Sequence, residues 1–128
     1  MSWLEIFIEE AESFASLTKI LEEFLSSANY IIEENGEKYL IETRARVDTI
    51  DGYKIEVYSD EHTPPHFHIV KNGKKLASYR IHDCKKLEGK IPSALEKKVL
   101  YFHEHAKDKL IKFWNDTRPG NCEIGKIV

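Results

Sequence analysis

The alternation of apolar and polar residues along the chain predicts amphipathic helices and short strands. Over residues 16–26 the apolar positions recur at i, i+3, i+4, i+7 and i+8, which is typical of one face of a helix. A longer periodic stretch follows Pro92, where residues 93–96 match a capping box, and it should end near Asp116. Its apolar stripe comprises Leu95, Val99, Phe102, Ala106, Leu110 and Phe113, with Trp114 at the edge. We therefore expect a shorter N-terminal helix and a long C-terminal helix.

Short runs with strand-forming residues lie between and before these helices. Asn35-Gly36 and Asn72-Gly73 each separate two such runs, and Asn-Gly is a strong hairpin signal because both residues tolerate positive φ. The predicted strands are residues 3–8, 30–34, 37–42, 53–58, 66–71 and 74–81. Together these elements predict an α+β fold, in which an antiparallel sheet of five or six strands packs against the long helix.

The composition is typical of one soluble globular domain spanning residues 1–128. Of these residues 41% are hydrophobic and 32% charged, and no apolar run approaches the roughly 18 residues of a membrane span. The N-terminus lacks the basic start of a secretory signal, so we expect a cytoplasmic protein without membrane contact. In that reducing compartment Cys84 and Cys122 should be free thiols.

Charge is distributed unevenly between the two parts of the chain. Residues 1–50 carry 4 basic and 11 acidic groups, whereas residues 51–128 carry 15 basic and 11 acidic groups. The first part therefore has a net charge of −7 and the second part +4, before any histidine is protonated. Such asymmetry can indicate an anion-binding region beside an acidic one, or simply two solvated faces of opposite bias.

The segment His-Thr-Pro-Pro-His-Phe-His at residues 62–68 is the strongest candidate site. Because strand side chains alternate between faces, His66 and His68 should share a face, about 7 Å apart. With His62 they supply three imidazoles, the ligand number of a catalytic zinc site, so one hypothesis is a divalent metal such as zinc. On the helical wheel, His103 should turn toward the sheet and His105 toward solvent.

Two further hypotheses for these histidines do not need a metal. His66, His68 and His103 could perform general acid–base catalysis on a phosphate-bearing substrate such as RNA. The cations that hold the phosphate would then be Lys71, Lys74, Lys75 and Arg80. Alternatively, the sheet histidines are structural: they hydrogen-bond loop carbonyls or stack on Tyr58 or Tyr79, while Phe67 points into the core. The residues alone leave the three hypotheses open.

Three segments of the chain resemble a family of small bacterial proteins, the domain of unknown function 4160. They are residues 60–69, residues 87–92 (Leu-Glu-Gly-Lys-Ile-Pro), and residues 109–114 of the closing helix. The resemblance implies a family-like core over residues 51–120 and an acidic extension over residues 1–50, with a strand, a helix and a hairpin. Many members carry a histidine on the closing helix where this chain has Ala106, so the chain departs from the pattern there.

The resemblance also implies a function, because family members often belong to gene pairs that resemble toxin–antitoxin modules. We expect a toxin-like component that acts on RNA or another phosphate-bearing substrate through its histidine cluster, with a cognate antitoxin-like protein as partner. The alternative is a non-enzymatic interaction or nucleic-acid-binding module in which the histidines are structural.

Overall fold

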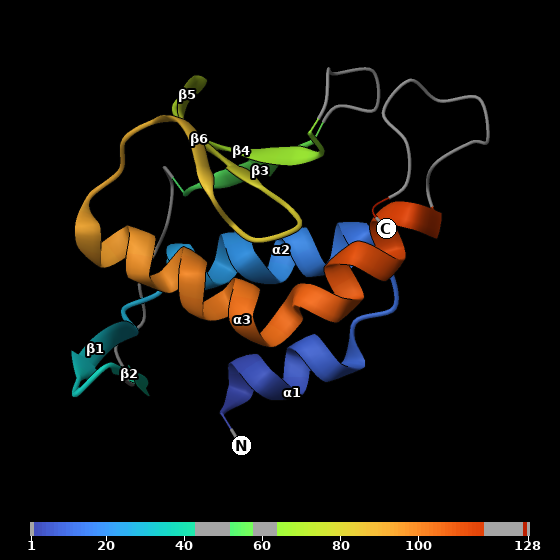
Figure 1. Ribbon diagram of the computed structural model, residues 1–128. Helices are drawn as coiled ribbons and strands as arrows, with labels where there is room; N and C mark the ends of the chain where they lie inside the picture. The colour runs from blue at the N-terminus through green and yellow to red at the C-terminus, as the bar shows by residue number, and fades with distance from the viewer. Residues whose placement is uncertain (1, 43–51, 58–63, 117–126, 128) are drawn as a thin grey trace.

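The computed structural model describes residues 2–42, 52–57, 64–116 and 127 (Figure 1). In these residues the chain forms three helices and six strands, and the predicted α+β class is confirmed. The elements are α1 (Trp3–Glu10), α2 (Phe14–Leu25), β1 (Tyr30–Glu34), β2 (Glu37–Ile41), β3 (Lys54–Glu56), β4 (His66–Lys71), β5 (Lys74–Arg80), β6 (Lys86–Gly89) and α3 (Ser93–Asp116).

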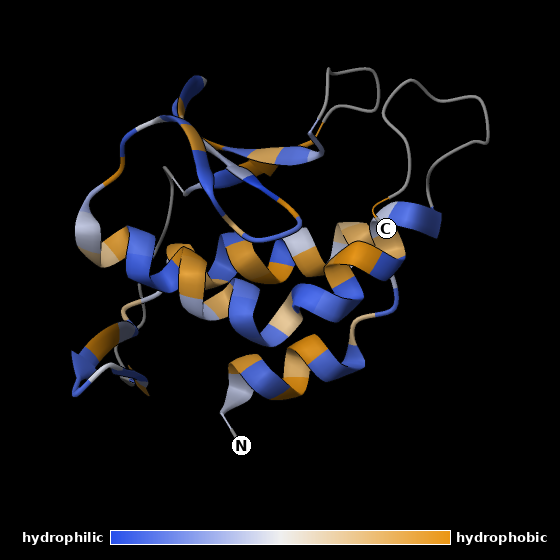
Figure 2. Cartoon of the chain, in the orientation of Figure 1, coloured by the Kyte–Doolittle hydropathy of each residue, from blue (hydrophilic) through white to orange (hydrophobic). Residues whose placement is uncertain are grey.

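The described strands form two antiparallel sheets, which differs from the single sheet that the sequence predicts. Strands β3, β4, β5 and β6 form a four-stranded sheet in that order, and β1 pairs only with β2. Figure 1 shows the four-stranded sheet on one side of α2 and α3, with α1 on the other side of these two helices. Apolar and polar residues alternate along all three helices (Figure 2), so each can pack an apolar face against its neighbours.

The N-terminal run at residues 3–8 is a helix, so the prediction of a strand there is wrong. The side chain of Ser2 caps the helix by accepting a hydrogen bond from the amide of Glu5 (3.2 Å). Leu4 and Ile8 then lie one turn apart and are both buried. Because almost every residue of this run is apolar, its periodicity did not distinguish a helix from a strand.

The two Asn-Gly turns are confirmed. In each turn both residues have positive φ, as a type I′ hairpin requires, and each connects two antiparallel strands. The strand predicted at residues 53–58 is shorter, with β3 covering residues 54–56, and Tyr58 lies outside the described residues.

Helix α3 begins at Ser93 itself, which differs from the predicted capping box. The carbonyl of Pro92 accepts hydrogen bonds from the amides of Leu95 and Glu96. The Glu96 carboxylate accepts a hydrogen bond from Tyr79 Oη on β5 (2.6 Å), so it fixes the helix to the sheet. The predicted apolar stripe is buried except for Phe113, which is half-buried.

Two lysines of α3 cap the carboxyl ends of the other two helices, neither of which has a basic residue in its last turn. Lys98 is buried, which lowers its pKa, and its ammonium donates to the carbonyls of Phe24 (3.3 Å) and Ser27 (2.9 Å) near the end of α2. The Lys109 ammonium donates to three carbonyls near the end of α1, those of Ile8, Glu9 and Ala11. A cation is favourable at both positions because helix C-termini carry partial negative charge.

One hydrophobic core includes residues from both parts of the chain. Leu4 and Phe24 from the N-terminal helices belong to the same buried cluster as Ile69 of β4 and Val99 of α3. None of the helices that the structure describes is long and apolar enough to cross a membrane.

Candidate functional site

The strand register assigns each residue of β4 to one of the two faces of the four-stranded sheet, because directly paired residues point to the same side. Phe67 pairs with Tyr79, whose hydroxyl donates to Glu96 of α3, so these two residues face the helices. Their rings stack with centroids 6.0 Å apart. His66 and His68, on either side of Phe67, therefore point to the opposite side, which we call the outer face of the sheet.

The two sheet histidines are in contact on this outer face. Their ring centroids lie 4.9 Å apart, with an edge-to-face angle of 75°, and each residue is only 7% exposed. His66 Nδ1 donates a hydrogen bond to the carbonyl of Pro64 (2.7 Å). In the neutral ring this bond fixes the tautomer, so that Nε2 carries the lone pair. The Pro-Pro segment thus orients the first imidazole before the strand begins.

His103 lies on the other side of the sheet and is not brought together with the histidine pair. It lines a small apolar cavity together with Phe67, which faces the helices. Its Nε2 donates to the carbonyl of Ile81 (2.6 Å), and burial lowers its pKa, which favours the neutral ring. A reaction that places a phosphate between His103 and a sheet histidine therefore has no geometric basis in this fold.

The register also brings polar residues to the histidine pair that the sequence did not indicate. His68 is directly paired with Glu56 of β3 and with Ser78 of β5, and Ser78 is paired with Glu88 of β6. These four residues form one row across the outer face. The alternation of β3, with Ile55 directed to the core, would have placed Glu56 on this face. The position of Ser78 depends on a bulge that no sequence pattern indicates.

That bulge determines which residue lies beside each histidine. Near the Asn72-Gly73 turn, Val70 pairs with Lys75, but the register shifts by one between Ile69 and Val70. Without the shift, His66 would pair with Tyr79. With the shift it pairs with Arg80. The proposed stacking of the histidines on Tyr79 is therefore wrong, because the tyrosine points to the helices.

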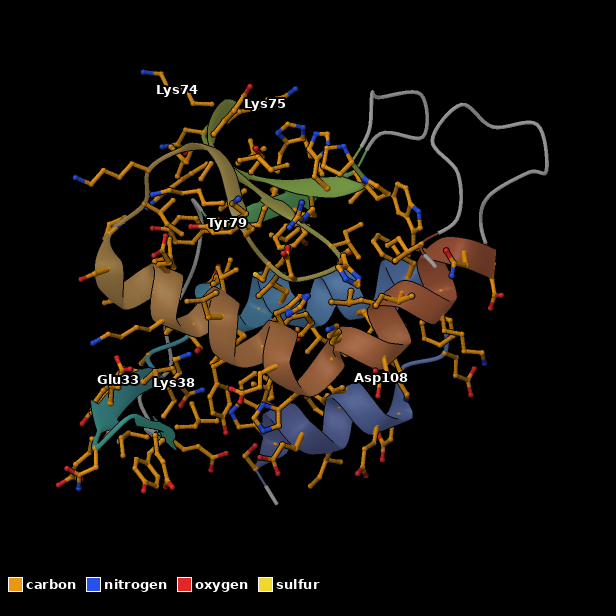
Figure 3. The ribbon with its side chains drawn as sticks, in the orientation of Figure 1. Glu33, Lys38, Lys74, Lys75, Tyr79 and Asp108 are labelled. Carbon is orange, nitrogen blue, oxygen red and sulfur yellow. The ribbon has the colours of Figure 1, made fainter. Side chains whose placement is uncertain are left out.

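Of the four predicted cations, the structure places Arg80 beside the histidines. Its guanidinium forms an ion pair with Asp83, in which Nε donates to Oδ1 (2.7 Å), and this holds the pKa of the Asp83 carboxyl well below its usual range. Lys71 extends over the Tyr53 ring, with Nζ 4.8 Å from the centroid. Lys74 and Lys75 are exposed at the end of the β4–β5 hairpin (Figure 3), about 13–17 Å along the strand from His66.

The three-histidine metal hypothesis involves one residue, His62, that lies outside the described residues. Within the parts of the chain that the structure describes, no group of three histidine, cysteine, aspartate or glutamate side chains is arranged to hold a metal ion. His66 and His68 could supply two ligands, since two imidazoles on one tetrahedral ion have ring centroids about 5 Å apart. The hydrogen bond from His66 Nδ1 to a carbonyl is also the usual outer-shell contact of a metal-bound histidine.

Cys84 is buried, and burial raises the pKa of its thiol to about 12. A thiol in this state is a poor nucleophile, which agrees with a structural role.

Comparison with known proteins places this site in a family. The family model described as Domain of unknown function (DUF4160) matches residues 52–115, which is half of the chain and includes the four-stranded sheet, the histidine pair and most of α3. Neither a curated protein nor a solved structure matches the chain. The chain belongs to the DUF4160 family.

Proposed function

We propose that the protein acts on RNA or another phosphate-bearing substrate at the outer face of the four-stranded sheet, with His66 and His68 as the reactive pair. The observation that carries this proposal is the edge-to-face contact of two buried imidazoles, 4.9 Å apart, on the face that does not contact the helices. Core packing does not require polar rings there, since the core side of β4 is filled by Phe67 and Ile69.

The chemistry would follow from the fixed tautomer of His66. Its Nε2 can accept a proton from an attacking hydroxyl, while a protonated His68 donates a proton to the leaving oxygen. Both rings point to the outer face of the sheet. The attacking and leaving oxygens of a bound phosphate must therefore lie on that side, one near each ring. In an in-line displacement these oxygens lie on opposite sides of phosphorus, so each ring would face one of them. Arg80, opposite His66, would hold a non-bridging oxygen.

The same pair supports a metal-assisted form of the reaction. His66 and His68 would hold a divalent cation such as zinc, which would activate a water molecule and offset the charge of the phosphate. In either form, we place the protein in the bacterial cytoplasm as the toxin-like member of a toxin–antitoxin-type pair, with an antitoxin-like protein as its partner. This is the role that the family resemblance implies.

A second candidate function is non-enzymatic binding of a nucleic acid or protein. It is favoured by the His66–Pro64 hydrogen bond, which gives the ring a structural role, and by the exposed Lys74 and Lys75. In this case the lysines at the hairpin end make the contacts, and affinity falls steeply with salt.

The first experiment measures cleavage of end-labelled RNA by the parent protein and by the His66→Gln and His68→Gln variants. Glutamine keeps a hydrogen-bonding side chain but does not titrate. If the proposal holds, each variant keeps its fold by circular dichroism and loses about 100-fold or more in rate. The matched control is His105→Gln, on the exposed side of α3, which should cleave at the parent rate.

The outcomes separate the two functions. If the parent cleaves no RNA, but the Lys74→Gln/Lys75→Gln variant binds RNA less tightly and with a smaller salt dependence, the binding function is correct. If the histidine variants only unfold at a lower temperature, the histidines are structural. Elemental mass spectrometry of untagged parent and of His66→Ala/His68→Ala distinguishes the two catalytic forms. Metal bound only by the parent supports the metal-assisted reaction.

A further inference from the structure

The β1–β2 hairpin has one face that packs on the protein and one that is exposed. Ile31 is buried and Leu40 packs against the core, and these two residues are directly paired. On the other face Ile32 pairs with Tyr39, and Tyr30 pairs with Ile41. Tyr30 is 47% exposed, Ile32 39% and Tyr39 45%, so the hairpin presents apolar side chains on both sides of its sheet.

This exposure is concentrated in one part of the described chain. Across the described residues, six large hydrophobic side chains are exposed, and five of them lie within residues 2–42. The six are Ile6, Phe7, Tyr30, Ile32, Tyr39 and Leu87. Three of the five belong to the exposed face of this one hairpin. Neighbouring exposed apolar residues with a polar rim are typical of a protein-binding surface.

The rim of this face is acidic. Glu34 and Glu37 are directly paired at the turn end, on the same side as Ile32 and Tyr39. Like charges at directly opposed positions destabilise a hairpin, and a cation close to both carboxylates would relieve the repulsion. The Tyr39 hydroxyl donates to Glu37 (2.6 Å), which holds this carboxylate beside the aromatic ring. Residues 30–42 contain four glutamates, including Glu42, and one lysine.

We propose that the exposed face of the β1–β2 hairpin, which carries Ile32 and Tyr39, docks a basic segment of another protein. Lysine or arginine side chains of that segment would meet Glu34 and Glu37, and an apolar side chain would pack between Ile32 and Tyr39. Side chains two positions apart share a face of an extended strand, so basic and apolar residues at positions i and i+2 fit this arrangement, in which both features lie on one face of the hairpin.

This docking surface is separate from the histidine pair. Glu33 and Lys38 of the hairpin lie on the opposite side of the helices from Lys74 and Lys75, at the end of the β4–β5 hairpin (Figure 3). The hairpin also lies outside residues 52–115, which the family model matches. A partner bound there would not cover the outer face of the four-stranded sheet, so the two proposals can fail independently.

The test uses the full chain and a fluorescently labelled peptide, Lys-Thr-Ile-Thr-Lys-Thr-Ile, whose lysines and isoleucines share one face of a strand, with a counterpart in which glutamate replaces both lysines as a charge control. Fluorescence anisotropy at low salt should show saturable binding of the lysine peptide and none of the glutamate peptide. Ile32→Ser should weaken binding about tenfold or more, which is the effect of losing one buried isoleucine. Glu34→Gln/Glu37→Gln should weaken binding and reduce its salt dependence.

Ile6→Ser is the matched control, because Ile6 is also 39% exposed but lies on α1. It should leave the affinity unchanged. The proposal is overturned if the lysine peptide does not bind at millimolar concentration, or if Ile6→Ser and Ile32→Ser weaken binding equally. It is also overturned if the parent self-associates in sedimentation velocity and Ile32→Ser abolishes this, because the occupant is then a second copy of the chain.

Discussion

Replacing Gly89 with alanine tests how closely β5 and β6 approach each other. Gly89 has a φ of +77°, and a Cβ atom at this position would overlap the carbonyl oxygen of Leu76 and lie 2.8 Å from the Cα of Ala77. Both are backbone atoms of the neighbouring strand, so no side-chain rotation can relieve the overlap. Gly73, in the β4–β5 turn, has a similar φ of +75°, but a Cβ atom added there would have no neighbour within 4 Å.

The two glycines therefore separate the cost of the backbone conformation from the cost of the close approach. Gly73→Ala should lose only the preference for positive φ, about 1 kcal/mol. Gly89→Ala loses the same amount and must also displace β6, which breaks the hydrogen bond from the Lys90 amide to Leu76 (3.1 Å) and disturbs the neighbouring pairs. We expect a total of about 3 kcal/mol or more, since each lost hydrogen bond costs about 1 kcal/mol and the steric strain adds to it.

Thermal unfolding by circular dichroism measures the difference. For a chain of this size, 1 kcal/mol corresponds to about 4 °C in Tm, so the expected decreases are about 4 °C for Gly73→Ala and about 12 °C or more for Gly89→Ala. Equal decreases in Tm for the two variants would refute the close approach of the strands. The result also bears on the site, because Glu88, next to Gly89, is paired with Ser78 in the row that contains His68.

Three other predictions concern buried or capping groups. Lys109→Met should lower the free energy of unfolding by about 1–3 kcal/mol in urea titrations, because three carbonyls lose their cationic donor, whereas the exposed Lys112→Met should change it by less than about 0.5 kcal/mol. In a Cys122→Ser background, Cys84 should react slowly with iodoacetamide at pH 8 and rapidly in urea; fast reaction of the folded protein would contradict its burial. Because burial lowers the pKa of His103, the unfolded chain binds a proton more readily, so stability should fall as the pH decreases below about 6.5. His103→Gln should reduce this slope in denaturant titrations, and an unchanged slope would assign the pH dependence to other groups.

Most of the helices and hairpins could be predicted because their signals are local. The two Asn-Gly turns and the long apolar stripe of α3 depend only on residues a few positions apart, and the structure has all of them. The prediction for residues 3–8 failed because a run of almost continuous apolar residues fits both periodicities. The sequence did not predict that β1–β2 forms a sheet of its own. Tertiary packing decides this, and the alternation of apolar and polar residues along a strand gives no information about it.

The candidate site was only partly accessible to sequence reasoning. Alternation correctly suggested that His66 and His68 share a face, and the helical wheel turned His103 inward. Neither pattern showed that His103 and the histidine pair lie on opposite sides of the sheet. The bulge at Ile69 and Val70 was equally inaccessible, because the extra residue on β5 is chosen by packing, and it replaces Tyr79 by Arg80 opposite His66.

The two capping lysines of α3 have a consequence for how relatives of this protein are compared. Lys98 and Lys109 lie within the family-matched residues 52–115, but the carbonyls that accept their hydrogen bonds belong to residues 8–27, outside it. A relative made of the family region alone has no helix ends for such ammonium groups to cap, and a buried cation at the position of Lys98 would be costly there. In an alignment of the family, lysine at both positions should therefore accompany N-terminal helices, and a smaller or apolar residue should accompany their absence. Two positions of the shared domain would thus record whether a sequence carries the additional helices.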